Sequence, residues 1–442
     1  MLTRRISIAA LGPFAVGCLV GQAALAAGYF IDQQSVPGLG RANAGNVAAA
    51  NDPSTIFFNP AGMTELWLLD PSDTTRASTG LSVIMPKAEI KNRGSTATSP
   101  GTLGLAAPLS GFNESNPTDP TPVSSAYLAQ RVGNRLFFGL GFNAPFGLAA
   151  KYDENWFGRY DATEIKLLTI NINPSVAYKL SDRISIGGGF DVQYAYAELA
   201  TAIPNPLAPG GPTPATDGRF SVDGNSWTAG YNFGILYKAT QNFRLGASYR
   251  SGMEHDLSGT AVFNPGGLVT GASTELNLPA LASAGAVWDF GPRWSLYGDV
   301  TWYDWSVSDV TRIRFVSRTT PDAVRPVHFH DSWTGALGLE NHWNENLTLR
   351  AGVMFDESPT NDAFRDTTFA DDNRLWLAIG ATYKICDYVT ADFAFTHVLV
   401  EETSIDITRT FFGGTPLKTT AAIKADVEAY VDTLAFNLRY KF

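Results

Sequence analysis

The chain has 442 residues, a length that would allow two or three globular domains, and its formal net charge of −10 disfavours nucleic acid as a partner. Apolar residues make up 45% of the chain, aromatic residues 12% and charged residues only 17%, which excludes a globally disordered protein. No uninterrupted stretch of about 18 apolar residues follows the N-terminal region, so a bundle of membrane-spanning helices is excluded, whereas strands that are apolar only at alternate positions are compatible with the sequence.

The first 26 residues have the features of a secretory signal peptide. Arg4 and Arg5 are followed by an apolar stretch from residue 6 to residue 20. Ala24-Leu25-Ala26 then places small residues at the two positions that a signal peptidase recognises. We therefore predict that residues 1–26 are removed by cleavage after Ala26.

The two cysteines bear on the type of leader and on covalent cross-links. Cys18 follows Ala15-Val16-Gly17, which weakly resembles a lipoprotein cleavage box, so a lipid-anchored form is an alternative to simple cleavage. After removal of residues 1–26 the remaining cysteine is Cys386. A single thiol supports neither an intramolecular disulfide nor a thiolate metal site.

Residues 27–73 show no regular alternation of apolar and polar positions. The stretch from residue 38 to residue 50 is composed mainly of small, weakly helix-forming residues. It is followed by Asn51-Asp52-Pro53-Ser54 and by Asn59-Pro60-Ala61, which are typical of turns. This segment must either form a tail or fold against the rest of the chain.

From residue 74 onward the sequence falls into segments in which every second residue is apolar. The segment 184–196 places mainly Ile, Phe, Val and Tyr at even positions and mainly Ser, Gly, Asp and Gln at odd positions. Segments 347–356 and 374–385 alternate in the same way. Most segments are roughly 10 to 20 residues long, whereas strands of soluble sandwiches have about 5 or 6 residues and roughly 9 to 11 tilted residues cross a bilayer. The pattern therefore predicts transmembrane β-strands.

The connections between these segments alternate in length. Short turns are predicted at Gly133-Asn134, Ser181-Asp182, Thr240-Gln241, Gly291-Pro292, Asn344-Glu345 and Cys386-Asp387. Long segments rich in Pro, Gly, Ser, Thr and Asp lie between them, at residues 91–122, 146–163, 201–218, 262–272, 316–327, 357–372 and 408–426. Six short turns and seven long loops join fourteen strands, the arrangement of outer-membrane barrels with both termini in the periplasm. A large soluble β-protein is the alternative.

The C-terminal segment supports the barrel. Its last residues alternate between apolar positions, at Leu434, Phe436, Leu438, Tyr440 and Phe442, and small or polar positions. A terminal aromatic residue on a lipid-facing strand is usual in bacterial outer-membrane barrels. We therefore predict an all-β fold in which residues 74–442 form a 14-stranded antiparallel transmembrane β-barrel.

A barrel of this size would enclose an aqueous hole if its lumen were empty. We therefore predict that residues 27–73 fold inside the lumen as a plug, or hatch. A periplasmic tail is the simpler alternative.

Several motifs resemble one known family. They are Ala27-Gly28-Tyr29, Gly38-Leu39-Gly40-Arg41-Ala42 and Asn59-Pro60-Ala61 near the N-terminus, and residues 335–338, 346–352, 355–359 and 372–380 in the C-terminal third. In this order and spacing the chain resembles the FadL family, which are bacterial outer-membrane transporters of long-chain fatty acids and other hydrophobic compounds. The resemblance covers essentially the whole chain after residue 26.

The resemblance implies passive diffusion of an apolar substrate through a hatch-closed barrel, with no cofactor. Substrate would bind in a groove among the extracellular loops, pass to an inner pocket that touches the N-terminus, and leave through the wall beside an inwardly bent third strand. Tyr29 and Phe30 would lie against the inner pocket, and Asn59, Pro60 and Ala61 would anchor the hatch where it faces the third strand. The expected surroundings are outer-membrane lipid and lipopolysaccharide, and the expected state is a monomer.

Pro145-Phe146-Gly147 follows the predicted third strand. Because proline cannot donate to the ladder, Pro145 marks an edge, a bulge or a strand end. One interpretation is a local gap in the wall that gives a lateral opening. The other is that the strand simply ends.

Two arginines are candidates for binding a carboxylate. Arg350 and Arg374 have the parity opposite to the apolar face of their strands and should point into the lumen. An inward arginine can bind a fatty-acid head group in a bidentate manner, or it can pair with an acidic neighbour. Arg325, His328 and His330 lie where the resemblance places basic residues, but the spacing is irregular there, so uncharged substrates such as alkanes or monoaromatic hydrocarbons are an alternative.

Other classes of function have weaker support. His255-Asp256, residues 328–331 and Glu401-Glu402 are titratable clusters, but none has a nucleophile and an orienting group at a recognisable spacing, so no enzyme is predicted. His328 and His330 would supply only two ligands, so no metal site is predicted. A general porin for hydrophilic solutes would need an open lumen lined with charge, against which the long N-terminal segment argues.

Overall fold

The computed structural model describes residues 28–67, 73–317 and 320–442. The predicted signal peptide lies outside the described residues, as do residues 68–72 next to the predicted boundary between plug and barrel. Within the described ranges, no helix has the length and apolar character needed to cross a membrane.

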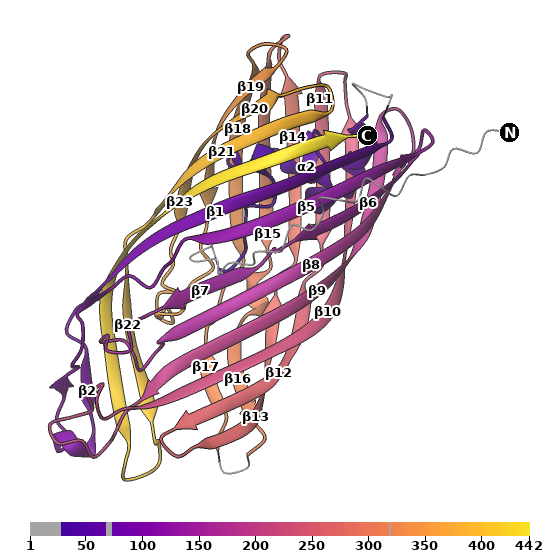
Figure 1. Ribbon diagram of the computed structural model, residues 1–442. Helices are drawn as coiled ribbons and strands as arrows, with labels where there is room; N and C mark the ends of the chain where they lie inside the picture. The colour runs from indigo at the N-terminus through magenta and orange to yellow at the C-terminus, as the bar shows by residue number, and fades with distance from the viewer. Residues whose placement is uncertain (1–27, 68–72, 318–319) are drawn as a thin grey trace.

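Fourteen antiparallel strands close into a barrel, as predicted (Figure 1). The closure is made by β1 (Thr75–Asn92), which pairs with β5 (Thr121–Val132) on one side and with β23 (Thr419–Lys441) on the other. The wall continues from β5 through β6 (Leu136–Asn143), β8 (Glu164–Lys179), β9 (Ile184–Ile203), β10 (Gly218–Lys238), β11 (Phe243–Arg250), β14 (Leu281–Asp289), β15 (Trp294–Tyr303), β18 (Ser332–His342), β19 (Leu347–Asp356), β20 (Arg374–Lys384) and β21 (Val389–Val400).

Most strands are prolonged at the end of the barrel that carries the long loops. The prolongations are β7 (Gly147–Lys151), β12 (Met253–Asn264), β13 (Leu268–Leu278), β16 (Val310–Phe315), β17 (Ala323–Pro326) and β22 (Thr403–Phe411). The loops also contain β2 (Thr96–Thr98), β3 (Ala107–Pro108), β4 (Glu114–Ser115) and the 3₁₀ helices η3 (Pro100–Thr102) and η4 (Trp305–Val307). The six predicted short turns lie at the other end, where the C-terminus also lies (Figure 1).

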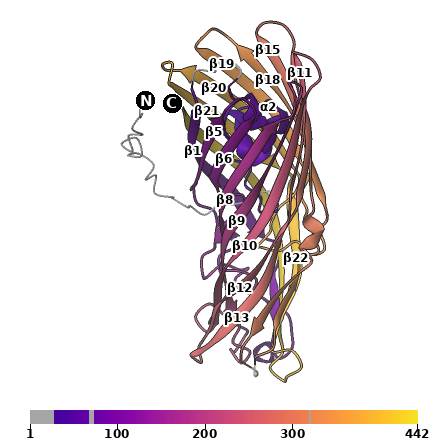
Figure 2. The ribbon, with the colours of Figure 1, turned by 90° about the vertical axis from the view of Figure 1, so that its right-hand side faces the viewer.

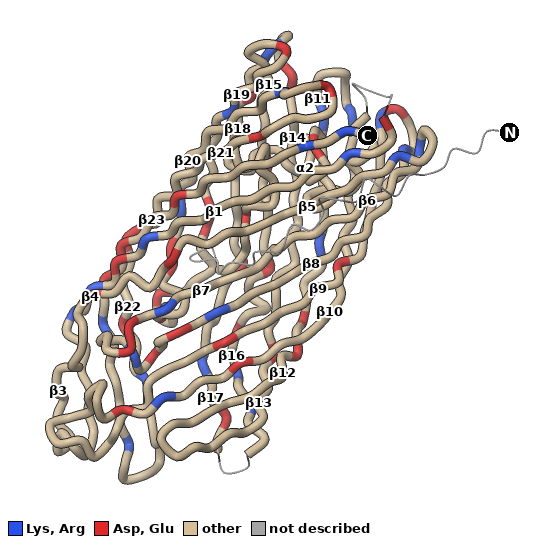
Figure 3. The backbone as a smooth tube through the Cα atoms, viewed as in Figure 1, with Lys and Arg blue, Asp and Glu red and all other residues tan. Residues whose placement is uncertain are grey.

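Side chains alternate across the wall as a lipid-facing barrel requires. In β23, Phe436 is exposed on the outer face and Ala435 is buried. In β1, Arg76 lies near one end and Lys87 lies toward the other, while residues 77–86 carry no charge (Figure 3). An apolar outer band with charged residues beyond it matches the hydrocarbon layer of a bilayer.

Residues 28–67, called the N-terminal segment below, lie inside the barrel. They form α1 (Val36–Leu39), α2 (Asn46–Ala49), α3 (Thr55–Phe58) and the 3₁₀ helix η2 (Pro60–Glu65), and nearly all of these residues are buried. α1 contacts β20 and β21, α2 contacts β11 and β14, and η2 contacts β6, β8, β9 and β10. Because these strands come from all round the wall, the segment occupies the lumen between them (Figure 2).

Glycines allow the N-terminal segment to pack on the backbone of the wall. A Cβ atom at Gly352 in β19 would lie 2.1 Å from the carbonyl oxygen of Arg41. A Cβ atom at Gly234 in β10 would lie 1.9 Å from Oδ1 of Asn59. A larger residue at either place would push the segment away from the wall.

Candidate functional site

An apolar cavity of about 160 Å³ lies in the lumen between the N-terminal segment and the loops. Its strand lining includes Leu148, Leu167, Leu199, Val222, Leu257 and Leu276, and Tyr29, Val327, Phe329 and Phe369 border it from the N-terminus and the loops. We call it the apolar cavity. A site with this lining suits a small apolar ligand.

Charged residues border the apolar cavity at a few places. Arg325 and Lys166 are the basic lining residues within the described ranges. Lys166 has the parity of the outward-facing Ile172, and its ammonium lies 5.7 Å from the ring centroid of Tyr196. Arg325 is mostly buried. The acidic lining residues are Glu198, Asp223, Glu275 and Asp309.

Tyr29 borders the cavity with its ring and anchors its hydroxyl in the wall. The ring centroid lies 4.6 Å from that of Trp305 and 5.8 Å from that of Phe369. The hydroxyl lies 3.0 Å from Oγ of Ser308 and donates to the carbonyl of Asn277 at 3.3 Å. The residue is therefore held by aromatic contacts and a polar tip.

The start of the N-terminal segment pairs with the wall like a short strand. The amide of Ile31 donates to the carbonyl of Pro145 at 2.8 Å, and the amide of Gly147 donates to the carbonyl of Tyr29 at 2.9 Å. These two bonds bring residues 29–31 against the junction between β6 and β7.

Phe30 packs at this pairing. Its ring centroid lies 5.5 Å from that of Phe146 and 5.3 Å from that of Tyr303. Two aromatic contacts of this geometry add to the apolar area that Phe30 buries. The triplet Pro145-Phe146-Gly147 thus contacts the predicted gating residues directly.

The third strand changes partners at this junction. β6 pairs with β5 from Leu136 to Phe142, whereas the only strand of the described wall with which β7 pairs is β8. The first residues of β5, Thr121–Ser125, pair with β1 alone within the same ranges. Gln34 links the end of β6 to β5. Its Nε2 donates to the carbonyl of Ala144 at 2.9 Å, and its backbone carbonyl accepts from the hydroxyl of Tyr127 in β5 at 3.0 Å.

Asn59 and Pro60 begin η2. Oδ1 of Asn59 accepts from the amide of Ala61 at 3.1 Å, and Pro60 takes a first-turn position that needs no amide donor. Nδ2 of Asn59 donates to the carbonyl of Val47 at 2.7 Å and to that of Ile235 at 3.0 Å. Asn59 therefore links two parts of the N-terminal segment to β10.

The third strand, β6, is contacted by residues near Asn59-Pro60-Ala61 in the sequence. A Cβ atom at Gly139 of β6 would lie 2.6 Å from Sδ of Met63 and 2.8 Å from Cγ1 of Ile56. A Cβ atom at Gly187 of β9 would lie 2.5 Å from the amide nitrogen of Ala61. Asn59 and Ala61 thus contact β10 and β9, and the contact with β6 is made by Ile56 and Met63.

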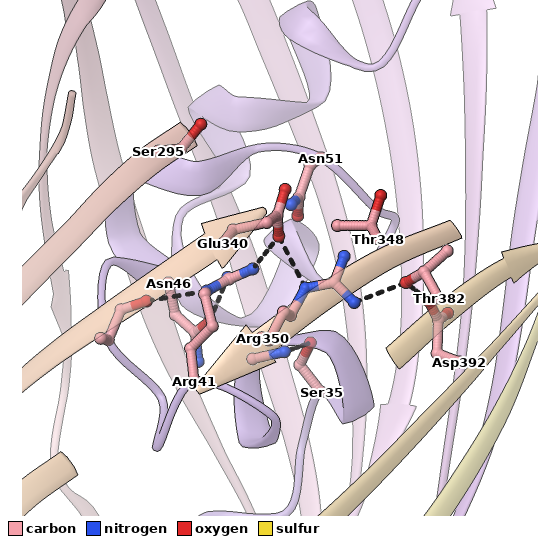
Figure 4. A network of polar contacts seen from close by, with 12 residues as sticks. Ser35, Arg41, Asn46, Asn51, Ser295, Glu340, Thr348, Arg350, Thr382 and Asp392 are labelled. Atoms are coloured by element: carbon pink, nitrogen blue, oxygen red, sulfur yellow. Dashed lines mark hydrogen bonds and ion pairs between the residues drawn. The ribbon is translucent and has the colours of Figure 1, made fainter. Parts of the chain in front are cut away.

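Arg350 points inward and is buried in a polar network beside the N-terminal segment (Figure 4). Its Nε donates to Glu340 at 2.6 Å, and its Nη1 donates to Thr382 at 2.5 Å. Arg41 of the N-terminal segment approaches the same Glu340 carboxylate at 3.3 Å. Arg350 is not among the residues that line the apolar cavity, and its contacts fix Arg41 to the wall.

Arg374 also points inward and is buried. Its Nε donates to the carboxylate of Asp371 at 3.0 Å. The same carboxylate accepts from the Ser358 hydroxyl at 2.9 Å and from the backbone of Gly28. Arg374 therefore positions the acidic group that holds the start of the N-terminal segment.

Four charged residues from different loops and strands form an ion-pair cluster beside the apolar cavity. Arg409 lies 2.6 Å from both Asp161 and Asp366, and Arg325 lies 3.1 Å from Asp161 and 3.6 Å from Asp366. We call this the loop ion cluster. It ties together the regions around residues 161, 325, 366 and 409.

The loop ion cluster determines the ionisation of Asp161. Burial by itself would raise the pKa of Asp161, but Arg409 and Arg325 outweigh burial and, with hydrogen bonds from Thr367, lower the pKa to about 2. The side chain of Asp161 is therefore mainly ionised at pH values above about 2.

The histidines named from the sequence are placed apart from one another. His328 contacts the carboxylate of Asp309 on the surface, the backbone amide of His330 donates to Pro359 at 3.1 Å, and the buried His255 lies 3.0 Å from Oε1 of Gln193. Among the residues that the structure describes, no three His, Cys, Asp or Glu residues are grouped to hold a metal ion.

Several residues of the site escaped the sequence analysis. Trp305, Phe329 and Phe369 pack around Tyr29, and Asp161 and Asp366 bind Arg325. Each lies in or next to a loop, where no periodic pattern marks an inward side chain. Their grouping becomes visible only when the loops are folded over the barrel.

The comparison with known proteins decides the family. The family described as "Outer membrane protein transport protein (OMPP1/FadL/TodX)" matches residues 17–442. The chain belongs to this family. Its location is accordingly the bacterial outer membrane, with the short turns toward the periplasm and the long loops outside the cell.

Individual members of the FadL family are similar to this chain over most of its length. A long-chain fatty acid transport protein of Salmonella typhi is 28% identical over 86% of this chain and 89% of its own length. A putative outer membrane protein of Neisseria meningitidis is 28% identical over 94% of this chain and 95% of its own length.

Solved structures share the fold. A FadL homologue of Pseudomonas aeruginosa superimposes with a TM-score of 0.81 at 23% identity, covering 94% of this chain and 99% of its own. The toluene transporter TbuX of Ralstonia pickettii superimposes with a TM-score of 0.64 at 20% identity, covering 91% of this chain and 98% of its own.

The loop ion cluster makes the loop end sensitive to acid. Because the pKa of Asp161 is lowered to about 2 from 3.8, its stabilising effect is complete above about pH 4 and is lost as the pH falls toward 2. The difference corresponds to a free energy on the order of 2 kcal/mol. We expect pepsin to begin cutting near residues 161 and 366 as the pH is lowered through this window.

The matched variant is Asp161→Asn. Pepsin should already cut this variant at the same sites near pH 4, the upper end of the window. The barrel of the variant should still show heat-modifiable migration in gel electrophoresis. Cleavage sites would be mapped by mass spectrometry. Equal protection of the parent protein across the whole window would contradict the assignment.

Proposed function

We propose that the chain is an outer-membrane channel for the passive uptake of long-chain fatty acids or similar hydrophobic small molecules. The observation that carries the proposal is the apolar cavity, which is bordered by Tyr29 and lies next to the place where the N-terminal segment pairs with the third strand. The similarity to fatty acid and toluene transporters supports an apolar ligand. We propose no enzymatic activity, and a monomer surrounded by outer-membrane lipid and lipopolysaccharide.

In this proposal residues 27–73 act as a hatch in the barrel of residues 74–442. Substrate is captured among the loops and enters the apolar cavity, where it competes with the ring contacts of Tyr29. Residues 29–31 then leave the junction of β6 and β7. Because β7 lacks a β5 partner in the described wall, substrate leaves sideways past Pro145, Phe146 and Gly147 into the membrane.

The buried arginines act in this scheme by holding the hatch. Arg350 acts through Glu340 on Arg41, and Arg374 acts through Asp371 on Gly28. Their guanidinium groups are occupied by carboxylates inside the protein, which favours this role over binding of a head group. Asn59, Pro60 and Ala61 hold the opposite side of the hatch.

Removing the rings that hold the start of the hatch tests the latch. Each buried ring contributes about 1.5 to 3 kcal/mol to holding residues 29–31 at the junction of β6 and β7, so Tyr29→Ala combined with Phe30→Ala should let bound palmitate leave at least ten-fold faster. Retention is measured as the rate at which palmitate dissociates from the purified protein. Phe57→Ala is the control, since this ring belongs to the same segment but packs on Phe58 and Arg250. Unchanged retention in the double variant would disprove the latch.

Pro145→Val tests the lateral path. Valine supplies the missing amide donor and tolerates continued strand pairing, so uptake of palmitate into cells should slow several-fold while binding is unchanged. Pro292→Val, in the short turn between β14 and β15, is the control at a proline on another part of the wall. Uptake at the parental rate by Pro145→Val would place the exit elsewhere.

Hydrocarbons such as alkanes or monoaromatic compounds are the second candidate substrate class. The observation in their favour is that Arg325, a basic residue bordering the cavity, already contacts Asp161 and Asp366. A charged head group would have to share this arginine, whereas a hydrocarbon needs no polar partner. A general hydrophilic porin has less support, because the N-terminal segment occupies the lumen.

Arg325→Gln separates the two classes. If a carboxylate binds here, palmitate affinity should fall roughly ten-fold or more through loss of a charge-assisted hydrogen bond, and toluene affinity should not change. Arg409→Gln is the matched control, because Arg409 belongs to the same loop ion cluster without lining the cavity. Equal small effects of both variants on both ligands would favour the hydrocarbon class.

A further inference from the structure

A second apolar hollow lies on the outside of the barrel, across β8, β9, β10 and β11. It has a volume of about 950 Å³, and its outward-facing lining includes Val176, Ile186, Phe190, Phe233 and Tyr249. Phe190 is 70% exposed and Phe233 is 59% exposed, so both rings project from the wall. We call this hollow the outer groove. Figure 2 shows β8, β9 and β10 side by side on one flank of the barrel.

One outward-facing position on the floor of the groove carries no side chain. Gly187, Gly188 and Gly189 follow one another in β9. Gly188 has the outward parity of Ile186 and Phe190, and a Cβ atom placed on it would lie 3.0 Å from the ring of Phe233. Gly188 therefore leaves bare backbone beside that ring on the outer face, whereas Gly187 and Gly189 face inward.

A proline in the neighbouring strand adds to the depression. Pro174 of β8 has no amide to donate, and the pairing of β8 with β9 skips this position. Nδ2 of Asn173 donates instead to the carbonyl of Phe190 at 2.9 Å. The side chain of Asn173 therefore replaces a ladder hydrogen bond between β8 and β9 at this place.

The same strip of wall carries the N-terminal segment on its inner side. Gly187 faces inward against the amide of Ala61, and Gly234 faces inward against the side chain of Asn59. Only backbone separates the floor of the groove from the start of η2 at this place. A molecule in the groove would therefore lie on the opposite face of β9 and β10 from the N-terminal segment.

The position of the groove indicates its occupant. It lies close to the short turns at 181–182 and 240–241, and therefore in the half of the wall that faces the periplasmic leaflet. That leaflet of an outer membrane is made of phospholipid. An open hollow lined by aliphatic and aromatic side chains matches an acyl chain, and the exposed Arg183 in the turn below suits a phosphate group.

We propose that the outer groove binds an acyl chain of a phospholipid from the periplasmic leaflet, and that the bound lipid braces the strip of wall on which η2 docks. The proposed lipid site depends only on the location of the barrel in the outer membrane. It does not depend on which substrate the apolar cavity accepts.

The binding is tested with a phosphatidylethanolamine that carries a photoreactive diazirine in its acyl chain. The full-length mature protein is reconstituted with this lipid and irradiated, and adducts are mapped by mass spectrometry. We expect adducts concentrated in residues 174–178, 186–190 and 231–235, at several-fold higher yield than in the outward-facing residues of β18 and β19. Even labelling around the barrel would overturn the proposal.

Filling the groove should abolish the preference. Gly188→Leu places a side chain on the floor, and Val176→Trp fills the groove from the adjacent strand without touching a glycine. Gly335→Leu in β18 is the control, since this exposed glycine has no atom within 4 Å of an added Cβ. Adduct yield in the groove should fall several-fold in both filled variants and stay at the parental level in the control. Parental yield in both filled variants would overturn the site.

The bracing is tested by hydrogen exchange on the same protein with and without phosphatidylethanolamine. Amides of residues 61–66 should exchange several-fold faster without the lipid, while those of residues 38–41, which lie at α1 against β20 and β21, should not change. Equal exchange of residues 61–66 in the two states would overturn the bracing. Because palmitate binding in the apolar cavity is measured separately, failure here is distinguishable from failure of the proposed transport function.

Discussion

Inside a bilayer every backbone N–H and C=O group must find a partner within the protein, because the hydrocarbon layer offers none. The barrel meets this constraint almost everywhere through its ladder. One exception is the third strand, where β7 has left β5 and has β8 as its strand partner in the described wall. The bonds from Ile31 to Pro145 and from Gly147 to Tyr29 supply backbone partners from inside. Filling of the lumen and closure of the wall are therefore coupled.

The N-terminal segment is held by two different kinds of contact. Buried polar groups fix it at Arg41, Asn59 and Gly28, and loss of one partner from a buried ion pair typically costs 3–5 kcal/mol. The tip at Tyr29 and Phe30 is held mostly by rings. Ring contacts have little directional demand, so an apolar ligand can replace them, whereas the polar contacts set one position for the body of the segment.

The proposed substrate path and the proposed lipid site use the wall in contrasting ways. At the junction of β6 and β7 the ladder changes partners and the side chains are large. At the outer groove the ladder persists, with Asn173 replacing one bond, and the outward position at Gly188 carries no side chain. The first arrangement suits passage through the wall. The second suits a molecule that lies against the wall and transmits its presence to η2 without entering.

The sequence by itself determined the barrel, its fourteen strands and the inward direction of Arg350 and Arg374. These are local properties, since the side a residue faces follows from its parity within one strand and turn residues mark where each strand ends. The tertiary structure decided which groups those arginines meet, because the residue opposite depends on the register of every strand in the closed ring. It also brought together Asp161 and Arg409, which are 248 positions apart, and paired Phe30 with Phe146. No periodicity encodes such contacts, because loops and a non-repetitive segment reach them only after the ring has closed.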